Sequence, residues 1–140
     1  MSKTNVFRGN LMFASQHQLN FQTSSRRDDL ISLCYLLVSL LHNGTFLELD
    51  LNVNGMTGNQ AITTYKQIKQ NLKIKYLCTG NSSDLLEFIT EVFNYDFEQQ
   101  PRYDHLRTLL STLLQNETKE NKDKKIPKKS KLGGKESLNC

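Results

Sequence analysis

The sequence predicts a mainly α-helical protein. Apolar residues recur at spacings of three and four along 60–73, 82–93 and 101–114, which is the period of an amphipathic helix. A fourth segment, 30–41, is apolar at almost every position, which is typical of a helix buried at the centre of a structure. No convincing alternation of apolar and polar residues indicates a strand.

Composition limits the class of protein. The chain has 140 residues, the length of one ordinary domain, and no run of about 18 apolar residues that could cross a membrane. Its first residues lack the apolar core of a secretory signal. Three cysteines without CxxC spacing predict neither a disulfide framework nor a zinc site. We therefore expect a cytoplasmic or nuclear protein with no membrane contact and no metal.

Charge divides the chain into two predicted parts. Residues 1–116 carry ten basic and ten acidic side chains, whereas 117–140 carry eight lysines against four acids. The second part has almost no large apolar residues, so it is predicted to be a lysine-rich disordered tail. Its KDKKIPKKSK stretch suits weak contacts with nucleic acid or with the nuclear import machinery, and a merely solvated tail is the alternative.

The apolar helix has clear start and stop signals. Residues 24–25 are serines, which are favoured at helix N-caps, and Asp28 and Asp29 suit the positive end of a helix dipole. Asn43-Gly44 supplies a left-handed stop. Before this helix, residues 1–23 show no sustained period and are predicted to be irregular.

A loop and a second helix are predicted next. Residues 45–59, TFLELDLNVNGMTGN, contain the turn residues Asn54-Gly55 and Gly58. In the helix 60–73, the face predicted to point inward carries Ile62, Tyr65, Ile68 and Leu72. The opposite face is predicted to be solvated and carries Lys66, Lys69 and Lys73.

Two further helices complete the prediction. Ser82-Ser83-Asp84 is a strong N-cap signal for the first of them. Its predicted inward side chains are Leu85, Phe88, Ile89, Val92 and Phe93. The other helix begins at Pro101, and its apolar positions are Tyr103, Leu106, Leu110, Leu113 and Leu114.

Four stretches together carry a family resemblance. FRGNLMFAS at 7–15 is similar to the pattern F-x-G-T-x-x-Y-A-S, and SRRDDLISLCYLL at 25–37 is similar to S-R-R-D-D-L-E-S-L-G-Y-x-L. YLCTGNSS at 76–83 resembles V-L-C-x-G-x-P-S-E, and DFEQQPRYDHLR at 96–107 resembles F-x-x-K-P-D-Y-x-x-L-R. These are patterns of the casein kinase I family of protein kinases, and the likeness covers roughly residues 6–115.

The resemblance implies a partial kinase C-terminal lobe, residues 1–116, built around the apolar helix as its central post. Asp29 corresponds to the aspartate that accepts backbone N–H bonds from the catalytic loop in these kinases. The other structural positions implied by the family pattern are Gly9, Asn10, Arg26, Arg27, Asp28 and Arg107.

The substrate side of the pattern is altered. Asn10 replaces a threonine that bonds the catalytic aspartate in the family. Met12 replaces an arginine that helps to hold an acidic or phosphorylated substrate residue, and Gln67 stands near the position of its second cation. Cys34 replaces a closely packed glycine, and it is predicted to be a buried, unreactive thiol. The resemblance therefore implies a degenerate anion site.

The catalytic motifs of a kinase do not occur in these 140 residues. Phosphoryl transfer needs a Gly-rich loop, a strand lysine, an HRD-type aspartate and a DFG-type aspartate for magnesium. We expect a non-catalytic chain that binds no cofactor, and either a protein-interaction module or a degenerate remnant. The alternative is part of a longer serine/threonine kinase or pseudokinase, which would use ATP and magnesium only when completed by an upstream half.

Two further expectations follow. Ser15, His17 and His42 invite comparison with a hydrolase triad, but no nucleophile motif surrounds Ser15, and with His105 the histidines are too scattered for a metal site. In a whole kinase the central helix is covered partly by upstream elements. Part of 30–41 is therefore expected to be exposed and to be covered by a protein partner.

Overall fold

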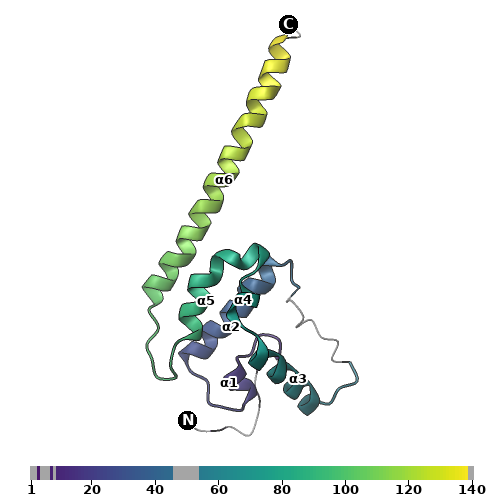
Figure 1. Cartoon of the computed structure of the whole chain (residues 1–140), viewed down its shortest axis with the longest axis vertical. Coiled ribbons are helices and arrows are strands. Elements are labelled where there is room, and N and C mark those ends of the chain that lie inside the picture. Colours follow the sequence, from purple (N-terminus) through teal and green to yellow (C-terminus); the bar gives the residue numbers. More distant parts are fainter. Residues whose placement is uncertain (1–2, 4–6, 8, 46–53, 139–140) are drawn as a thin grey trace. The chain divides into compact units, whose positions relative to one another are not determined.

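The computed structural model describes residues 3, 7, 9–45 and 54–138, with side chains described as far as residue 124. Its elements, in chain order, are the helices α1 (Gln16–Leu19), α2 (Arg26–Leu41), α3 (Gly58–Asn71) and α4 (Ile74–Leu77), the 3-10 helix η2 (Gly80–Leu85), and the helices α5 (Leu86–Phe93) and α6 (Tyr103–Leu138) (Figure 1). Within these described ranges there is no strand, and one isolated bridge joins Lys3 to Gln22. The predicted mainly α class is confirmed.

The chain divides into two compact units, Met1–Pro101 and Arg102–Cys140. The first holds every element from α1 to α5, and the second holds α6. This division falls before the whole of α6, whereas the charge pattern places a boundary at 116/117.

The core of the first unit lies between α2 and α5, which pack against each other. From α2 come Ile31, Cys34, Tyr35 and Val38, and from α5 come Phe88, Ile89 and Val92, all buried. The Tyr35 and Phe93 rings meet edge to face with centroids 5.9 Å apart. Burial raises the pKa of the Cys34 thiol, so this cysteine is inert as predicted.

The predicted boundaries of the apolar helix are close to those of α2. Ser25 is its N-cap, and the chain leaves the helix through Asn43 and Gly44, whose φ angles of 58° and 81° are left-handed. The helix is not buried on every side, however. Leu36 is 40% exposed and Leu40 is 63% exposed. The expected exposure of part of 30–41 is therefore observed.

α3 begins two residues earlier than predicted, because Thr57 forms a capping box with Gln60. Gly58 is therefore the first residue of the helix rather than a turn residue, while Gly55 has the expected positive φ of 85°. Tyr65 is buried as predicted, and the other three predicted inward side chains, Ile62, Ile68 and Leu72, are half-buried. Residues 46–53 of the predicted loop lie outside the described residues.

The prediction that Lys69 faces solvent is wrong. This residue is only 3% exposed, whereas Lys66 is half-buried and Lys73 is exposed. The helical spacing was correct, but the buried stripe is centred on Ala61, Tyr65 and Lys69. A pattern that sorts residues only into apolar and polar does not predict a lysine in that stripe. The charge places lysine in the polar class, although its methylene stem can pack like an apolar side chain.

The segment 80–93 differs from the prediction at its start. Ser82 and Ser83 lie inside η2, and Leu85 rather than a serine is the N-cap of α5. Ser82 is fully buried, with its Oγ donating to the carbonyl oxygens of Leu77 and Thr79. Of the five side chains predicted to face inward, Phe93 is half-buried and the other four, Leu85, Phe88, Ile89 and Val92, are buried.

Two short helices were not predicted. α1 lies within the segment expected to be irregular, and Ser15 begins it through a capping box with Gln18. α4 has four residues, and only Leu77 among them is buried. Helices of a single turn carry too few residues to show a period, so the capping box was the one available signal for α1.

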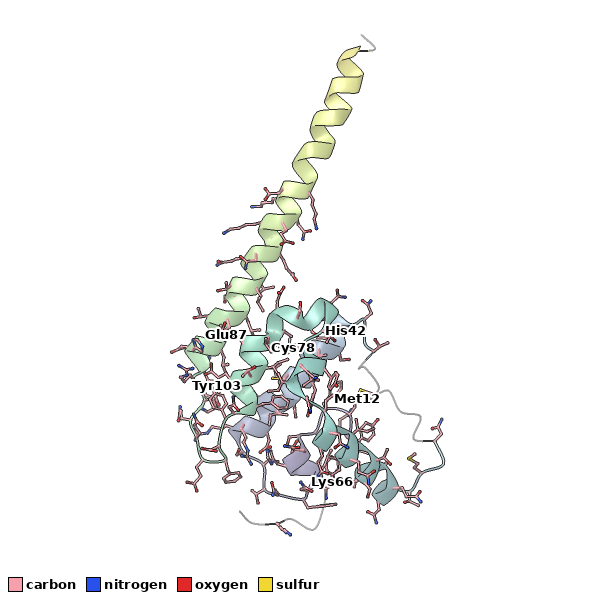
Figure 2. The ribbon with its side chains drawn as sticks, in the orientation of Figure 1. Met12, His42, Lys66, Cys78, Glu87 and Tyr103 are labelled. Carbon is pink, nitrogen blue, oxygen red and sulfur yellow. The ribbon has the colours of Figure 1, made fainter. Side chains whose placement is uncertain are left out.

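α6 extends beyond the last predicted apolar position, Leu114, and runs on through 117–138. Side chains project from all sides of its described part, and residues 114–124 are exposed (Figure 2). The lysine-rich tail is thus helical in the structure. Its predicted disorder in solution stays a prediction, and the side chains of most of KDKKIPKKSK lie outside the described residues.

Candidate functional site

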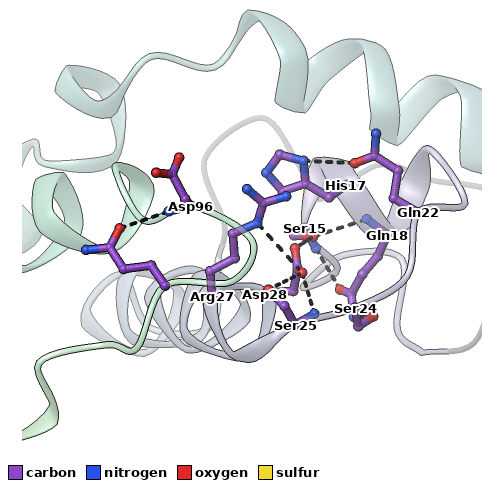
Figure 3. A network of polar contacts seen from close by, with 10 residues as sticks. Ser15, His17, Gln18, Gln22, Ser24, Ser25, Arg27, Asp28 and Asp96 are labelled. Atoms are coloured by element: carbon purple, nitrogen blue, oxygen red, sulfur yellow. Dashed lines mark hydrogen bonds and ion pairs between the residues drawn. The ribbon is translucent and has the colours of Figure 1, made fainter. Parts of the chain in front are cut away.

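The N-terminal end of α2 gathers residues from three of the four family-like stretches. Asp28 is fully buried there and accepts hydrogen bonds from Ser15 Oγ at 2.6 Å and from the Ser25 backbone N–H at 2.8 Å (Figure 3). Ser25 Oγ lies 3.3 Å from the same carboxylate. Ser15 is also the N-cap of α1. The Asp28 carboxylate therefore connects α1, and the segment that precedes α1, to the start of α2. We call Ser15, Ser25, Arg26, Arg27 and Asp28 the α2 junction.

The two arginines of the α2 junction hold the segment that follows α5. Arg26 is exposed, and its Nη1 donates to Gln100 Oε1 at 2.8 Å. Arg27 is buried, with its guanidinium 5.7 Å from the centre of the Phe97 ring. Its Nε is 4.0 Å from Asp28 Oδ2, and among the described residues Nε and Nη2 have no hydrogen-bond partner. Asp28 therefore supplies a counter-charge to a desolvated guanidinium.

His17 borders the α2 junction without joining it. Its Nδ1 lies 3.2 Å from Gln22 Oε1 (Figure 3). Burial lowers the pKa of His17, and the positive charge of Arg27 lowers it further. A neutral imidazole next to a buried arginine avoids a second desolvated cation at this place.

Asp29 differs completely from its neighbour in sequence. It is exposed, and no polar contact within the described part of the chain involves its carboxylate. The resemblance assigns Asp29 to the bonding of a catalytic loop, and here that carboxylate faces solvent beside the exposed leucines of α2. Asp28 instead supplies the structural contacts.

The segment 9–15 is shaped by a glycine with a positive φ angle and by a local turn. Its last two side chains, those of Ala14 and Ser15, are buried. Gly9 has a φ of 130°, which suits glycine. Asn10 Oδ1 accepts the Met12 N–H at 2.8 Å, so the residue in the family's threonine position closes a local turn. Met12 is half-buried and Gln67 on α3 is exposed. Neither carries a charge, and no contact between these two is recorded among the described residues. Arg8 lies outside them.

Sequence reasoning missed Lys69, which fixes the segment 9–15 against α3. Its Nζ donates to Leu11 O at 2.9 Å and to Ala14 O at 2.5 Å. The ammonium also lies 4.7 Å from the centre of the Tyr35 ring on α2. One side chain of α3 thus contacts both the family-like segment and the central helix.

The hydrolase alternative has no geometric support. Ser15 Oγ gives its proton to Asp28 rather than to a histidine. His42 Nε2 lies 3.1 Å from Ser82 Oγ, but that hydroxyl donates to the Leu77 carbonyl, so the imidazole is the donor. Among the described residues, no group of three His, Cys, Asp or Glu side chains could hold a metal ion. No helix in that part of the chain is long and apolar enough to span a bilayer.

Arg107, the last of the family-pattern positions, is described within its own unit. It lies in the second unit, on α6, and pairs with Asp104 one turn earlier at 2.9 Å. Both side chains are largely exposed. Such an exposed pair adds little to the stability of the helix, because water screens the two charges.

Comparison with known proteins decides the relationship. A probable casein kinase I homologue of Encephalitozoon cuniculi is 31% identical over 127 residues, 89% of this chain. A casein kinase 1-like protein of Oryza sativa subsp. japonica is 30% identical over 81% of the chain, and casein kinase I homolog 3 of Schizosaccharomyces pombe is 31% identical over 70%. The chain is casein kinase I-like.

The casein kinase I-like chain spans only part of these relatives. It corresponds to 39% of the length of the Encephalitozoon protein, 15% of the rice protein and 22% of the fission yeast protein. This coverage, together with a helical fold around α2, agrees with the C-terminal lobe of a kinase domain. No protein-family model matches the chain.

Proposed function

We propose that residues 1–116 act as a non-catalytic protein-interaction module of the casein kinase I type. The observation that carries this proposal is the exposed stripe on α2 formed by Asp29, Leu36 and Leu40. These residues are seven and four positions apart, so they share one helix face. Leu36 is 40% exposed and Leu40 is 63% exposed. Leucines exposed in this way on the central helix of a small domain favour a protein partner that covers them.

The stripe also indicates what kind of partner would fit. An apolar segment would cover Leu36 and Leu40, and a cation or a group of backbone N–H donors would meet Asp29. Pairing the carboxylate matters, because a buried unpaired charge would cost several kcal/mol, on the order of the whole gain from two leucines. We therefore infer an apolar protein segment that carries hydrogen-bond donors at one end.

The lack of catalysis is inferred from the residues present. In kinases the γ-phosphate is positioned by a Gly-rich loop, a strand lysine, magnesium and two aspartates. None of these motifs occurs in the 140 residues. The neutral Met12 and Gln67 also leave the anion site without cations. Without the positioning groups, ATP and magnesium have no site of the kinase kind in this chain.

Dye binding and light scattering test the interaction surface. The wild-type chain should bind 8-anilinonaphthalene sulfonate and scatter as an oligomer, because the α2 stripe is uncovered. The double variant Leu36→Ser/Leu40→Ser should lose most of both signals and keep its helical circular dichroism. A matched pair of exposed positions on α3, Thr63→Ala and Gln67→Ala, should change neither signal. A monodisperse wild-type monomer with no dye binding would contradict the proposal.

Nucleotide provides an independent test. The purified chain should show no thermal shift with ATP and magnesium and no transfer of phosphate to casein. A saturable shift, or transfer above a control without protein, would refute the non-catalytic assignment. The exposed α2 stripe would still be tested separately, by dye binding and light scattering.

Partial coverage of the relatives favours a second candidate, a longer serine/threonine kinase or pseudokinase of which this chain is one part. The α2 stripe would then be covered by an upstream part of the same polypeptide, and that part would bring ATP and magnesium. Transcript sequence upstream of the codon for Met1 separates the candidates. An open frame that encodes a DFG-like triplet just before it would favour the longer protein.

The tail and the cellular location belong to the same proposal. The lysine excess of 117–140 suits weak contacts with phosphates or with import machinery, so a cytoplasmic chain that also enters the nucleus is proposed. Fluorescent fusions with and without 117–140 would test this. An unchanged nuclear fraction on deletion would argue for a merely solvated tail.

A further inference from the structure

Lys69 is buried in an unusual environment for a lysine. The residue is 3% exposed and lies in the last turn of α3. Its Nζ is surrounded by the carbonyl oxygens of Leu11 and Ala14, at 2.9 and 2.5 Å, and by the ring of Tyr35, whose centre is 4.7 Å away. Lysine is rarely buried to this degree unless it is paired with an acid.

Within the described ranges, no acid is found against Lys69 from the elements packed around it. Segment 10–15 has the sequence NLMFAS and contains no ionisable carboxylate. From α2 it meets Tyr35, whose pKa is raised by burial, so that this phenol stays neutral. From α3 itself it meets Tyr65, with 5.8 Å between Nζ and the ring centre. α1 also packs against α3, but its only ionisable side chain, that of His17, interacts with Arg27 and Asp28 instead.

We propose that Lys69 is a proton-operated clasp: as a neutral amine it holds α3 against the segment 11–14, and protonation loosens this contact. A neutral amine keeps two N–H groups, which are enough for the two carbonyl acceptors. Protonation adds a third N–H and a full charge to a site in which the described residues supply no counter-charge. The carbonyl dipoles and tyrosine faces compensate for only part of the lost hydration.

The direction of the pH effect follows from burial. Desolvation lowers the pKa of Lys69 from its ordinary 10.5 to about 7. Between these two values the unfolded or opened chain binds a proton that the closed chain does not bind. The closed form therefore gains stability as pH rises from about 7 toward 10.5, and it loses this gain on acidification. The clasp thus opens on the acidic side of neutrality.

Urea unfolding of the full chain across pH 6 to 9.5 tests the clasp. Over the alkaline part of this range, the unfolding constant of the wild type should fall by up to about tenfold for each pH unit relative to Lys69→Met, which is the limit for one proton. Lys69→Met keeps the length of the side chain and removes its titration. Its overall stability is not the readout, because it also leaves two carbonyls unpaired. Lys66→Met, on the same helix, should retain the wild-type slope.

A direct titration keeps the proposal falsifiable if Lys69→Met does not fold. The 13Cε resonance of Lys69 in the wild-type chain should titrate near neutral pH, well below the other lysines. Hydrogen exchange of the α3 amides, corrected for the intrinsic pH dependence of exchange, should show more opening at pH 6 than at pH 9. Parallel pH profiles for wild type and Lys69→Met, or titration of the Lys69 resonance near 10.5, would overturn the clasp.

Discussion

Separate alanine substitutions of the adjacent Asp28 and Asp29 should distinguish the aspartate that stabilises the fold from the aspartate that is exposed. Asp28 is fully buried and has bonded donors at 2.6 and 2.8 Å, whereas Asp29 is exposed. The substitutions are chemically identical and one position apart in the first turn of α2. Helix propensity and the helix dipole are therefore nearly matched between the variants, and burial is the main difference.

The expected loss for Asp28→Ala is large. Hydrogen bonds to a charged group contribute roughly 1.5–3 kcal/mol each, and two of good length are lost. Removal of one partner of a buried ion pair costs about 3–5 kcal/mol, since the remaining charge, here on Arg27, is left uncompensated. The hydrogen bonds give about 3–6 kcal/mol and the ion pair about 3–5 kcal/mol, each a large fraction of the ~5–15 kcal/mol typical of a domain. Asp29→Ala should change stability very little, as exposed substitutions usually do.

Urea denaturation followed by circular dichroism at 222 nm measures the difference. Asp28→Ala should shift the midpoint far toward low urea or abolish the cooperative transition, and Asp29→Ala should keep the wild-type midpoint. Ser15→Ala, which removes one donor to Asp28, should fall between them at about 1.5–3 kcal/mol. Equal losses for the two aspartate variants would refute the assignment of Asp28 as the structural carboxylate.

Three further predictions follow from burial and composition. Val38→Asp should abolish the cooperative transition, because Val38 is fully buried. Leu40→Asp, at a 63% exposed position, should leave the midpoint nearly unchanged. Similar midpoints for the two variants would contradict the orientation of α2. Arg26→Ala should lower the unfolding free energy by about 1 kcal/mol at most, because its contact with Gln100 is exposed; a loss equal to that of Asp28→Ala would be contrary to this. A peptide of residues 117–140 should show little helical circular dichroism in water, since the segment has no apolar face to pack; a strong signal at 222 nm would show that the α6 continuation forms unaided.

The sequence predicted the fold best where local signals agreed. In α2, the N-cap serine, the acidic first turn, the apolar run and the Asn43-Gly44 stop all indicated the same helix, and its boundaries follow them closely. α5 was likewise predicted with its buried residues, because four of its apolar positions keep a helical period. The family patterns also selected residues that lie together, since Ser15, Ser25 and Asp28 share one network.

Prediction failed where tertiary contacts override side-chain polarity. Lys69 was assigned to solvent because it was grouped with Lys66 and Lys73 on one face of the predicted helix 60–73. No local pattern indicates the carbonyls of Leu11 and Ala14, 58 and 55 positions away. Ser82 was taken for a cap, yet its hydroxyl donates to the carbonyls of Leu77 at the end of α4 and of Thr79 just before η2. Buried polar groups of this kind depend on partners distant in sequence or on exact backbone geometry, and neither is visible in a hydrophobic period.

The mixed surroundings of α2 explain its nearly uniform apolar sequence. One face, with Cys34, Tyr35 and Val38, is buried by the rest of the described chain, and the opposite face exposes Leu36 and Leu40. A helix that served only this chain would be stabilised equally well with polar residues on the second face, and solubility would improve. Leucines at those positions are stabilising only when another surface covers them. The apolar character of α2 is therefore explained by the core of the chain on one face and by the partner surface that we propose on the other.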